Sequence, residues 1–179
     1  MTLDENDYLT HQLYIASKTP RIKKARIRSW ILTTVACLSM TYLFFENGND
    51  FLGFYFLIAS VLSLALYPFY SRWRYKRHYQ RFIADTYKNR FGEECSLEIN
   101  EDVILTKDRT REAKINCSEL EEINEIKEFF FLKLKTGGSI IISKVKTDAQ
   151  ELVKLQEGLK ELVNKKGIKH NMELDWKWR

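Results

Sequence analysis

The stretch FLGFYFLIASVLSLALYPFY, residues 51–70, carries no charged side chain in twenty positions. At 1.5 Å per residue a helix of that length measures about 30 Å, which matches the hydrocarbon core of a lipid bilayer. The sequence therefore predicts that residues 51–70 form a membrane-spanning helix.

A second apolar stretch, WILTTVACLSMTYLFF, precedes the first and covers residues 30–45 without a charge. The short connector ENGND, residues 46–50, joins the two stretches. We therefore predict a helical hairpin with spans at about 29–45 and 51–70. A hairpin buried in a soluble bundle would need apolar neighbours to cover it, and the flanking segments are basic instead.

Two basic blocks flank the hairpin. Residues 21–28 and residues 72–81 each carry five Lys or Arg and no acid, which accounts for the net charge of +5 and argues against a nucleic-acid footprint. Because Lys and Arg concentrate on the cytoplasmic side of membrane proteins, both termini are expected in the cytoplasm. The expected contacts with lipid at the membrane interface are these cations and two tryptophans: Arg21, Lys23, Lys24, Arg26, Arg28, Trp30, Arg72, Trp73, Arg74, Lys76, Arg77 and Arg81.

The second span has a face of small residues, and neither span carries a charged side chain. Gly53, Ala59, Ser60 and Ser63 offer a surface for close packing of the second span on the first. Ion or proton transport through hydrocarbon normally requires a charged side chain, so the uncharged spans argue against transport by a monomer.

Helical segments are expected on both sides of the hairpin region, residues 21–81. In the cytoplasmic segment 1–20, residues 6–18 read as an amphipathic helix with Leu9, Leu13 and Ala16 on one face. Residues 82–94 read as a helical connector that stops at Gly92.

From residue 95 the hydrophobic period changes to two, which predicts five or six short antiparallel strands up to residue 142. A helix over residues 148–165 follows, capped by Asp148, with Val153, Leu159 and Leu162 on its apolar face. Residues 95–179 are thus expected to form a small sheet covered by a closing helix, and the fold class is α+β.

The last twelve residues, 168–179, alternate strictly between apolar and polar side chains. Three interpretations remain open: a final strand that pairs with the sheet or a second subunit, a frayed tail, and a Trp-bearing arm in the lipid interface.

Five stretches of the sequence carry a resemblance to a known family: residues 7–17, 21–30, Pro68 with 70–79, 114–126, and 129–144. In these stretches the sequence resembles the YcxB-like family of small bacterial membrane proteins. The resemblance implies two transmembrane helices in the bacterial cytoplasmic membrane, followed by a cytoplasmic domain similar to pleckstrin-homology domains. It implies no particular reaction.

Motifs for catalysis, metals and cofactors were not found in the sequence. Cys37, Cys95 and Cys117 have unrelated spacings, and the three histidines are far apart and are expected at surfaces or interfaces. The acidic run over residues 119–128 is expected to be solvated surface. We therefore expect no catalytic, metal or cofactor residue.

Three hypotheses for the function follow. The first is a non-enzymatic membrane protein that presents its cytoplasmic domain to a protein or to lipid headgroups, through a surface near Arg109, Arg111, Lys133 and Lys135, with self-association also open. The second is an oligomeric scaffold or pore formed by the hairpin. The third is a membrane-bound enzyme.

Overall fold

The computed structural model describes residues 1–100, 102–108 and 112–178. The chain forms two compact units, each described separately below. The helical unit comprises Gln12–Arg81 and Trp178, and the β unit comprises Met1–His11 and Phe82–Lys177. The division differs from the expected separate segment over residues 1–20, because the first eleven residues belong to the β unit.

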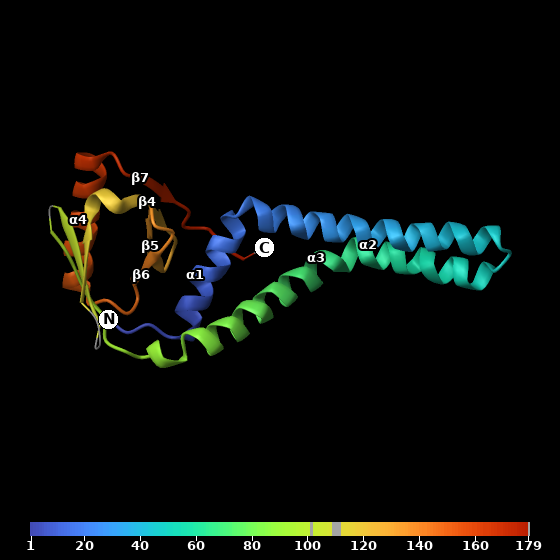
Figure 1. Cartoon of the computed structure of the whole chain (residues 1–179), viewed down its shortest axis with the longest axis horizontal. Coiled ribbons are helices and arrows are strands. Elements are labelled where there is room, and N and C mark those ends of the chain that lie inside the picture. Colours follow the sequence, from blue (N-terminus) through green and yellow to red (C-terminus); the bar gives the residue numbers. More distant parts are fainter. Residues whose placement is uncertain (101, 109–111, 179) are drawn as a thin grey trace. The chain divides into compact units, whose positions relative to one another are not determined.

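Two long helices dominate the helical unit (Figure 1), α2 (Pro20–Glu46) and α3 (Asp50–Thr86). Pro20 occupies the first turn of α2, where a missing backbone N–H costs nothing. Gly48, with a φ of 69°, reverses the chain between the helices. Both expected spans lie inside these helices, and both basic blocks are helical too.

Helices α2 and α3 pack antiparallel. Arg26 contacts Ser71, and Thr34 contacts Ser63 at 3.3 Å. A later residue of α2 thus contacts an earlier residue of α3, as expected for antiparallel helices. Gly53 is so close to the Phe45 ring that an added Cβ would lie 2.6 Å from it. The small-residue face expected on the second span therefore lies against α2, because only small side chains allow such close approach.

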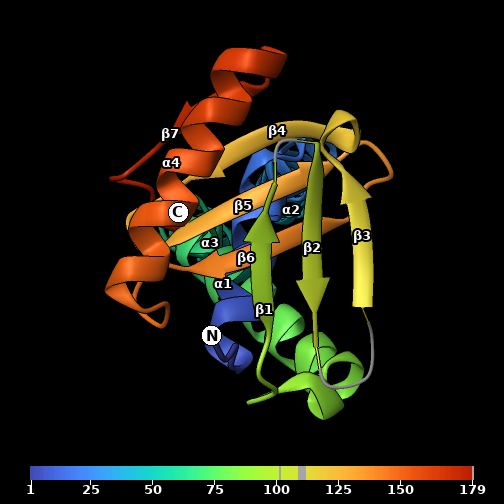
Figure 2. The same cartoon turned by 90° about the vertical axis from the view of Figure 1, so that its left-hand side faces the viewer.

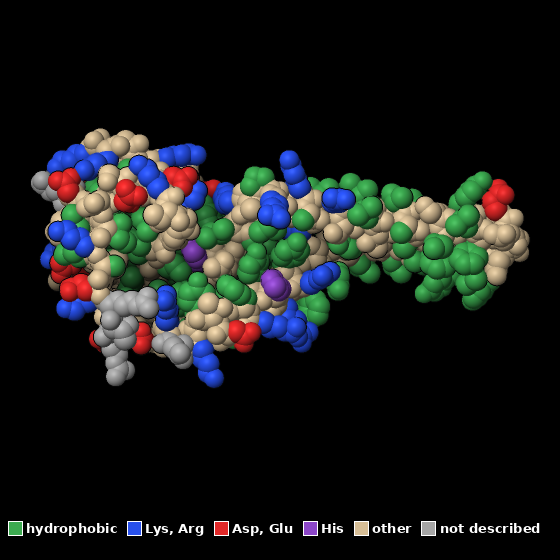
Figure 3. Space-filling model, in the orientation of Figure 1, with side chains coloured by type: hydrophobic (Ala, Val, Ile, Leu, Met, Phe, Trp, Pro, Cys, Tyr) green, Lys and Arg blue, Asp and Glu red, His purple; other side chains and the backbone are tan. Residues whose placement is uncertain are grey.

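On the face that Figure 3 shows, many apolar side chains lie on the outside of the hairpin, and acidic atoms lie near the connector. In each helix, the most apolar window of 18 residues is only 11% buried. By length and composition, both helices can cross a membrane.

In the described part of the β unit, two sheets lie next to helix α4 (Figure 2). The first sheet has the order β1-β2-β3 and the second the order β6-β5-β4-β7. The strands of the first sheet cross those of the second, and α4 lies beside both (Figure 2). The bounds are β1 (Ser96–Ile99), β2 (Val103–Lys107), β3 (Glu112–Asn116), β4 (Leu120–Glu125), β5 (Phe129–Leu134), β6 (Ser139–Ser143), α4 (Ala149–Lys166) and β7 (Lys169–Met172).

The sheet arrangement corrects two expectations. The expected single sheet is divided, because a 3-10 turn at Cys117–Glu119 interrupts the chain between β3 and β4. The terminal strand is confirmed only over Lys169–Met172, where it pairs in parallel with β4, while residues 173–178 are not strand.

Strand β5 is buried on both faces. Phe130 and Leu132 belong to the main core, together with Ile104 of the other sheet and Leu155, Leu159 and Leu162 of α4. On the opposite face, Phe131 lies 5.0 Å from the ring of His11, between ring centroids. A continuous apolar run such as Phe129–Leu132 is typical of a strand covered on both sides.

Helix α4 follows its expected pattern in part. Asp148 caps it by accepting a hydrogen bond from the Gln150 amide at 2.9 Å, as expected. The expected apolar face is wrong at Val153, which is 53% exposed. The buried face follows Leu155, Leu159 and Leu162, which the spacing of four and three residues brings onto one side.

The N-terminal residues are tied to the β unit. The Met1 amino group donates to the Cys95 carbonyl at 2.9 Å, and Thr2 forms a β-bridge with Glu94. Helix α1 (Glu5–Lys18) is capped by Asp4, whose side chain accepts from two backbone amides. Lys146 donates to Asp7 at 2.7 Å, and the Asp7 side chain is only 5% exposed.

The connector after α3 is only partly helical. Helix α3 ends at Thr86, and a short 3-10 helix, η1 (Lys88–Arg90), follows. Gly92 then takes a φ of 73°, a value that favours glycine, so the chain turns at the expected residue.

Candidate functional site

The antiparallel packing of α2 and α3 brings the two basic blocks to the same end of the hairpin. Residues 21–28 lie in the first turns of α2, and residues 72–81 lie in the second half of α3. Since the connector holds the acidic residues Glu46 and Asp50, the two ends of the hairpin have opposite charge. Ten cations therefore share one end of the helical unit.

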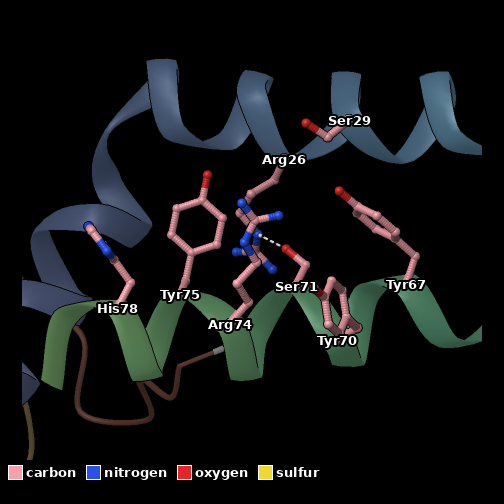
Figure 4. Close-up of a pocket in the computed structure, with 8 residues that line it drawn as sticks. All are labelled: Arg26, Ser29, Tyr67, Tyr70, Ser71, Arg74, Tyr75 and His78. Atoms are coloured by element: carbon pink, nitrogen blue, oxygen red, sulfur yellow. Dashed lines mark hydrogen bonds between the residues drawn. The ribbon is translucent and has the colours of Figure 1, made fainter. Parts of the chain in front are cut away.

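A polar cavity of about 280 Å³ lies between the helices at this basic end (Figure 4). The lining residues that the structure describes include two arginines, a histidine and several hydroxyl groups, and none of them is a carboxylate: Arg26, Ser29, Tyr67, Tyr70, Ser71, Arg74, Tyr75 and His78. Such a cavity offers hydrogen-bond donors and positive charge to an anion.

Arg26 is the most constrained cation of the cavity. It reaches from α2 to α3, where its Nε donates to Ser71 Oγ at 3.1 Å (Figure 4). Its guanidinium lies over the Tyr75 ring at 5.8 Å and over the Trp178 ring at 5.2 Å, measured to the ring centroids. These contacts hold the guanidinium in one orientation, which lowers the entropic cost of binding a ligand.

The Trp178 side chain is itself fixed. Its indole Nε1 donates to the backbone carbonyl of Arg72 at 3.3 Å. The end of the chain thus contributes an aromatic ring to the same group of cations.

A second cavity, of about 260 Å³, adjoins the first and shares Arg26, Tyr67 and Ser71 with it. Its other lining residues are mainly apolar: Lys23, Ile27, Trp30 and Pro68. The indole Nε1 of Trp30 is buried and has no hydrogen-bond partner in the described part of the chain. The same holds for Nε of Arg72. Buried donors without acceptors are uncommon in folded proteins, so this end of the helices has an excess of donors.

The expected interface residues divide into three groups. Arg26 and Arg74 line the polar cavity, while Lys23 and Trp30 line the apolar one. Arg72 and Arg77 lie over the rings of Phe69 and Trp73, at 5.5 and 5.2 Å. The remaining five are exposed cations of the helix surfaces: Arg21, Lys24, Arg28, Lys76 and Arg81.

Sequence reasoning did not group the uncharged residues of the cavity into one site. Tyr67, Ser71, Tyr75 and His78 follow one another at intervals of four, four and three residues, which places them on one face of α3. That spacing was the available signal. Ser71, only 5% exposed, lines both cavities together with Tyr67 and Arg26.

In the basic surface expected on the β unit, Lys133 forms ion pairs with acidic residues. Lys133 contacts Glu121 at 3.0 Å and Glu122 at 3.6 Å, and its hydrogen bond to Glu121 raises the pKa of the ammonium group. Arg109 and Arg111 lie outside the described residues. Lys135 is exposed.

The acidic run is not solvated throughout. The Glu125 side chain is only 15% exposed and contacts Lys144 at 2.6 Å and His170 at 3.0 Å. The expectation of plain surface is therefore wrong for Glu125, because strand β7 and Lys144 cover it.

His11 was expected at a surface or an interface, and it is buried in the β unit, at 7% exposure. Its Nε2 is buried and has no hydrogen-bond partner in the described part of the chain. Burial lowers the pKa of His11 to about 4, so the imidazole is neutral at physiological pH.

Among the described residues, no group of three or more His, Cys, Asp or Glu could hold a metal ion. Comparisons with known protein families, with characterised proteins and with solved structures found no match for this chain.

Proposed function

We propose that the chain is a multi-pass protein of the bacterial cytoplasmic membrane, in which α2 and α3 form the anchor. Both termini face the cytoplasm. The β unit is then a cytoplasmic module for contact with a protein or with lipid headgroups, and it catalyses no reaction.

The observation that carries this proposal is the exposure of two apolar helices. Their most apolar windows are 11% buried, whereas the core helix of a soluble protein would be covered by its neighbours. The eleven Leu, Ile, Val and Phe side chains of residues 51–70 favour insertion by roughly 3 to 7 kcal/mol. A bilayer removes this surface from water.

The charge distribution supports the orientation. All ten cations of the two basic blocks lie at one end of the hairpin, and the charged residues of the connector are both acids. Near an anionic leaflet each cation adds attraction of about 1 kcal/mol, reduced by salt. Trp30 and Trp73 lie beside these cations, where interfacial aromatic residues are common.

Alkaline carbonate extraction and thiol labelling test the proposal. In a cysteine-free background, an impermeant maleimide should label Asn49→Cys, in the connector, on intact cells. It should label Lys135→Cys, exposed on the β unit, only after lysis. Release of the chain by carbonate, or labelling of Lys135→Cys on intact cells, would refute the anchor or its orientation.

A further inference from the structure

We propose that the two adjoining cavities between α2 and α3 bind one anionic phospholipid molecule. Its phosphate occupies the polar cavity, between Arg26 and Arg74, and its glycerol and the start of an acyl chain occupy the apolar cavity, beside Ile27, Trp30 and Pro68. The inference rests on the proposed membrane location and adds a defined ligand site to it.

The first step of the argument is the chemistry of the polar cavity. A phosphate diester presents charged acceptor oxygens, and arginine binds phosphate through two parallel N–H donors. A guanidinium has five donors, so Arg26 can serve Ser71 and a phosphate oxygen together. Arg74 and His78 line the same cavity from α3 (Figure 4).

The second step is the pairing of a polar cavity with an apolar one. A free phosphate ion would use the polar cavity alone, whereas a phospholipid has a charged head joined to apolar chains. The two cavities meet at Arg26, Tyr67 and Ser71, which lie where head and chains would join. Each volume is close to the lower limit, roughly 300 Å³, of small-molecule pockets.

The third step concerns the buried indole N–H group of Trp30. Trp30 lines the apolar cavity, and its buried Nε1 has no acceptor among the described residues. A lipid ester or phosphate oxygen is an acceptor of the type that this indole requires, and indole N–H groups commonly find such partners at the membrane interface.

Quenching of tryptophan fluorescence by brominated lipids tests the inference on the full chain in nanodiscs. Nanodiscs of phosphatidylcholine should carry a small fraction of brominated phosphatidylglycerol or, in a parallel series, of brominated phosphatidylcholine. At equal mole fraction the anionic lipid should quench more, and Trp30→Phe should remove this excess. Arg26→Gln and Arg74→Gln should each raise the half-saturating fraction about tenfold.

Two matched variants separate a built site from diffuse attraction. Lys24→Gln and Arg81→Gln remove the same charge from the same two helices, but both residues are exposed and line neither cavity. They should change the half-saturating fraction by less than about twofold. If they act as strongly as Arg26→Gln and Arg74→Gln, the site does not exist.

Three further outcomes are distinguishable. If 10 mM inorganic phosphate displaces the anionic lipid where chloride of equal ionic strength does not, the site takes free phosphate and the lipid inference is wrong. If brominated phosphatidylcholine fails to quench Trp30 at any mole fraction, the helices are not in the bilayer and the membrane proposal itself fails. Quenching by both lipids to the same extent refutes only the lipid site.

Discussion

Acidification should destabilise the β unit through His11. The imidazole is buried, its Nε2 has no acceptor among the described residues, and its pKa is lowered from 6.5 to about 4. In the unfolded chain the same group titrates near 6.5. Between these two values the unfolded chain binds a proton that the folded chain excludes, so stability falls as the pH falls.

The size of the effect follows from the two pKa values. Relative to pH 7.5, the loss from His11 is about 1.4 kcal/mol at pH 5.5, and it approaches about 3 kcal/mol below pH 4. Above pH 7 the contribution is complete and no further change is expected from this residue.

Amide hydrogen exchange of β5 measures the effect, because Phe131 of this strand lies against the His11 ring. The opening free energy of the strand, corrected for intrinsic exchange at each pH, should be compared in the native chain and in His11→Phe. The variant keeps an aromatic ring against Phe131 but does not titrate. Carboxylates such as Asp4, whose pKa the hydrogen bond from Lys146 lowers, contribute equally to both chains and cancel. Equal pH dependence in the two chains would refute the reasoning.

Two further predictions concern the packing within each unit. Lys146→Met leaves the buried carboxylate of Asp7 without its cation and should lower the opening free energy of α1 by about 1–3 kcal/mol in hydrogen exchange. Lys165→Met, at an exposed helix pair, should cost under about 0.5 kcal/mol, and a similar loss in both would contradict the role of Asp7. Gly53→Leu forces a side chain against Phe45 and should destabilise the hairpin by about 1–3 kcal/mol in an SDS titration of helicity, where an unchanged midpoint would argue against close packing.

The hairpin was predictable because its signal is local. Charge is absent from residues 30–45 and 51–70, and a connector with two acids separates them, so the boundaries can be read without knowing any contact. The burial of β5 was visible for the same reason, since four successive apolar residues need cover on both faces.

Contacts between distant residues could not be read in this way. The sequence predicts that Lys133 and Glu125 are charged strand residues, but their ion pairs depend on strand register and on β7, which returns in parallel after a whole helix. The hydrogen bond of Arg26 to Ser71 likewise depends on the packing register of two helices across 45 residues of chain. Periodicity places a residue on a face, but the partner of that face is set by tertiary packing.

The position of the cavities follows from one face of α3 that changes composition along its length. In the apolar part of α3, small residues on this face allow close contact with α2: Gly53, Ser60 and Ser63. In the basic part, the same helical spacing continues with mostly larger polar and aromatic residues: Tyr67, Ser71, Tyr75 and His78. Large side chains such as Arg26 and Tyr75 cannot pack as closely as Gly and Ser, so space remains between the helices there. Because the change occurs where apolar sequence gives way to Lys and Arg, the space is apolar on one side and cationic on the other. An amphipathic anion is the kind of ligand that fits both sides.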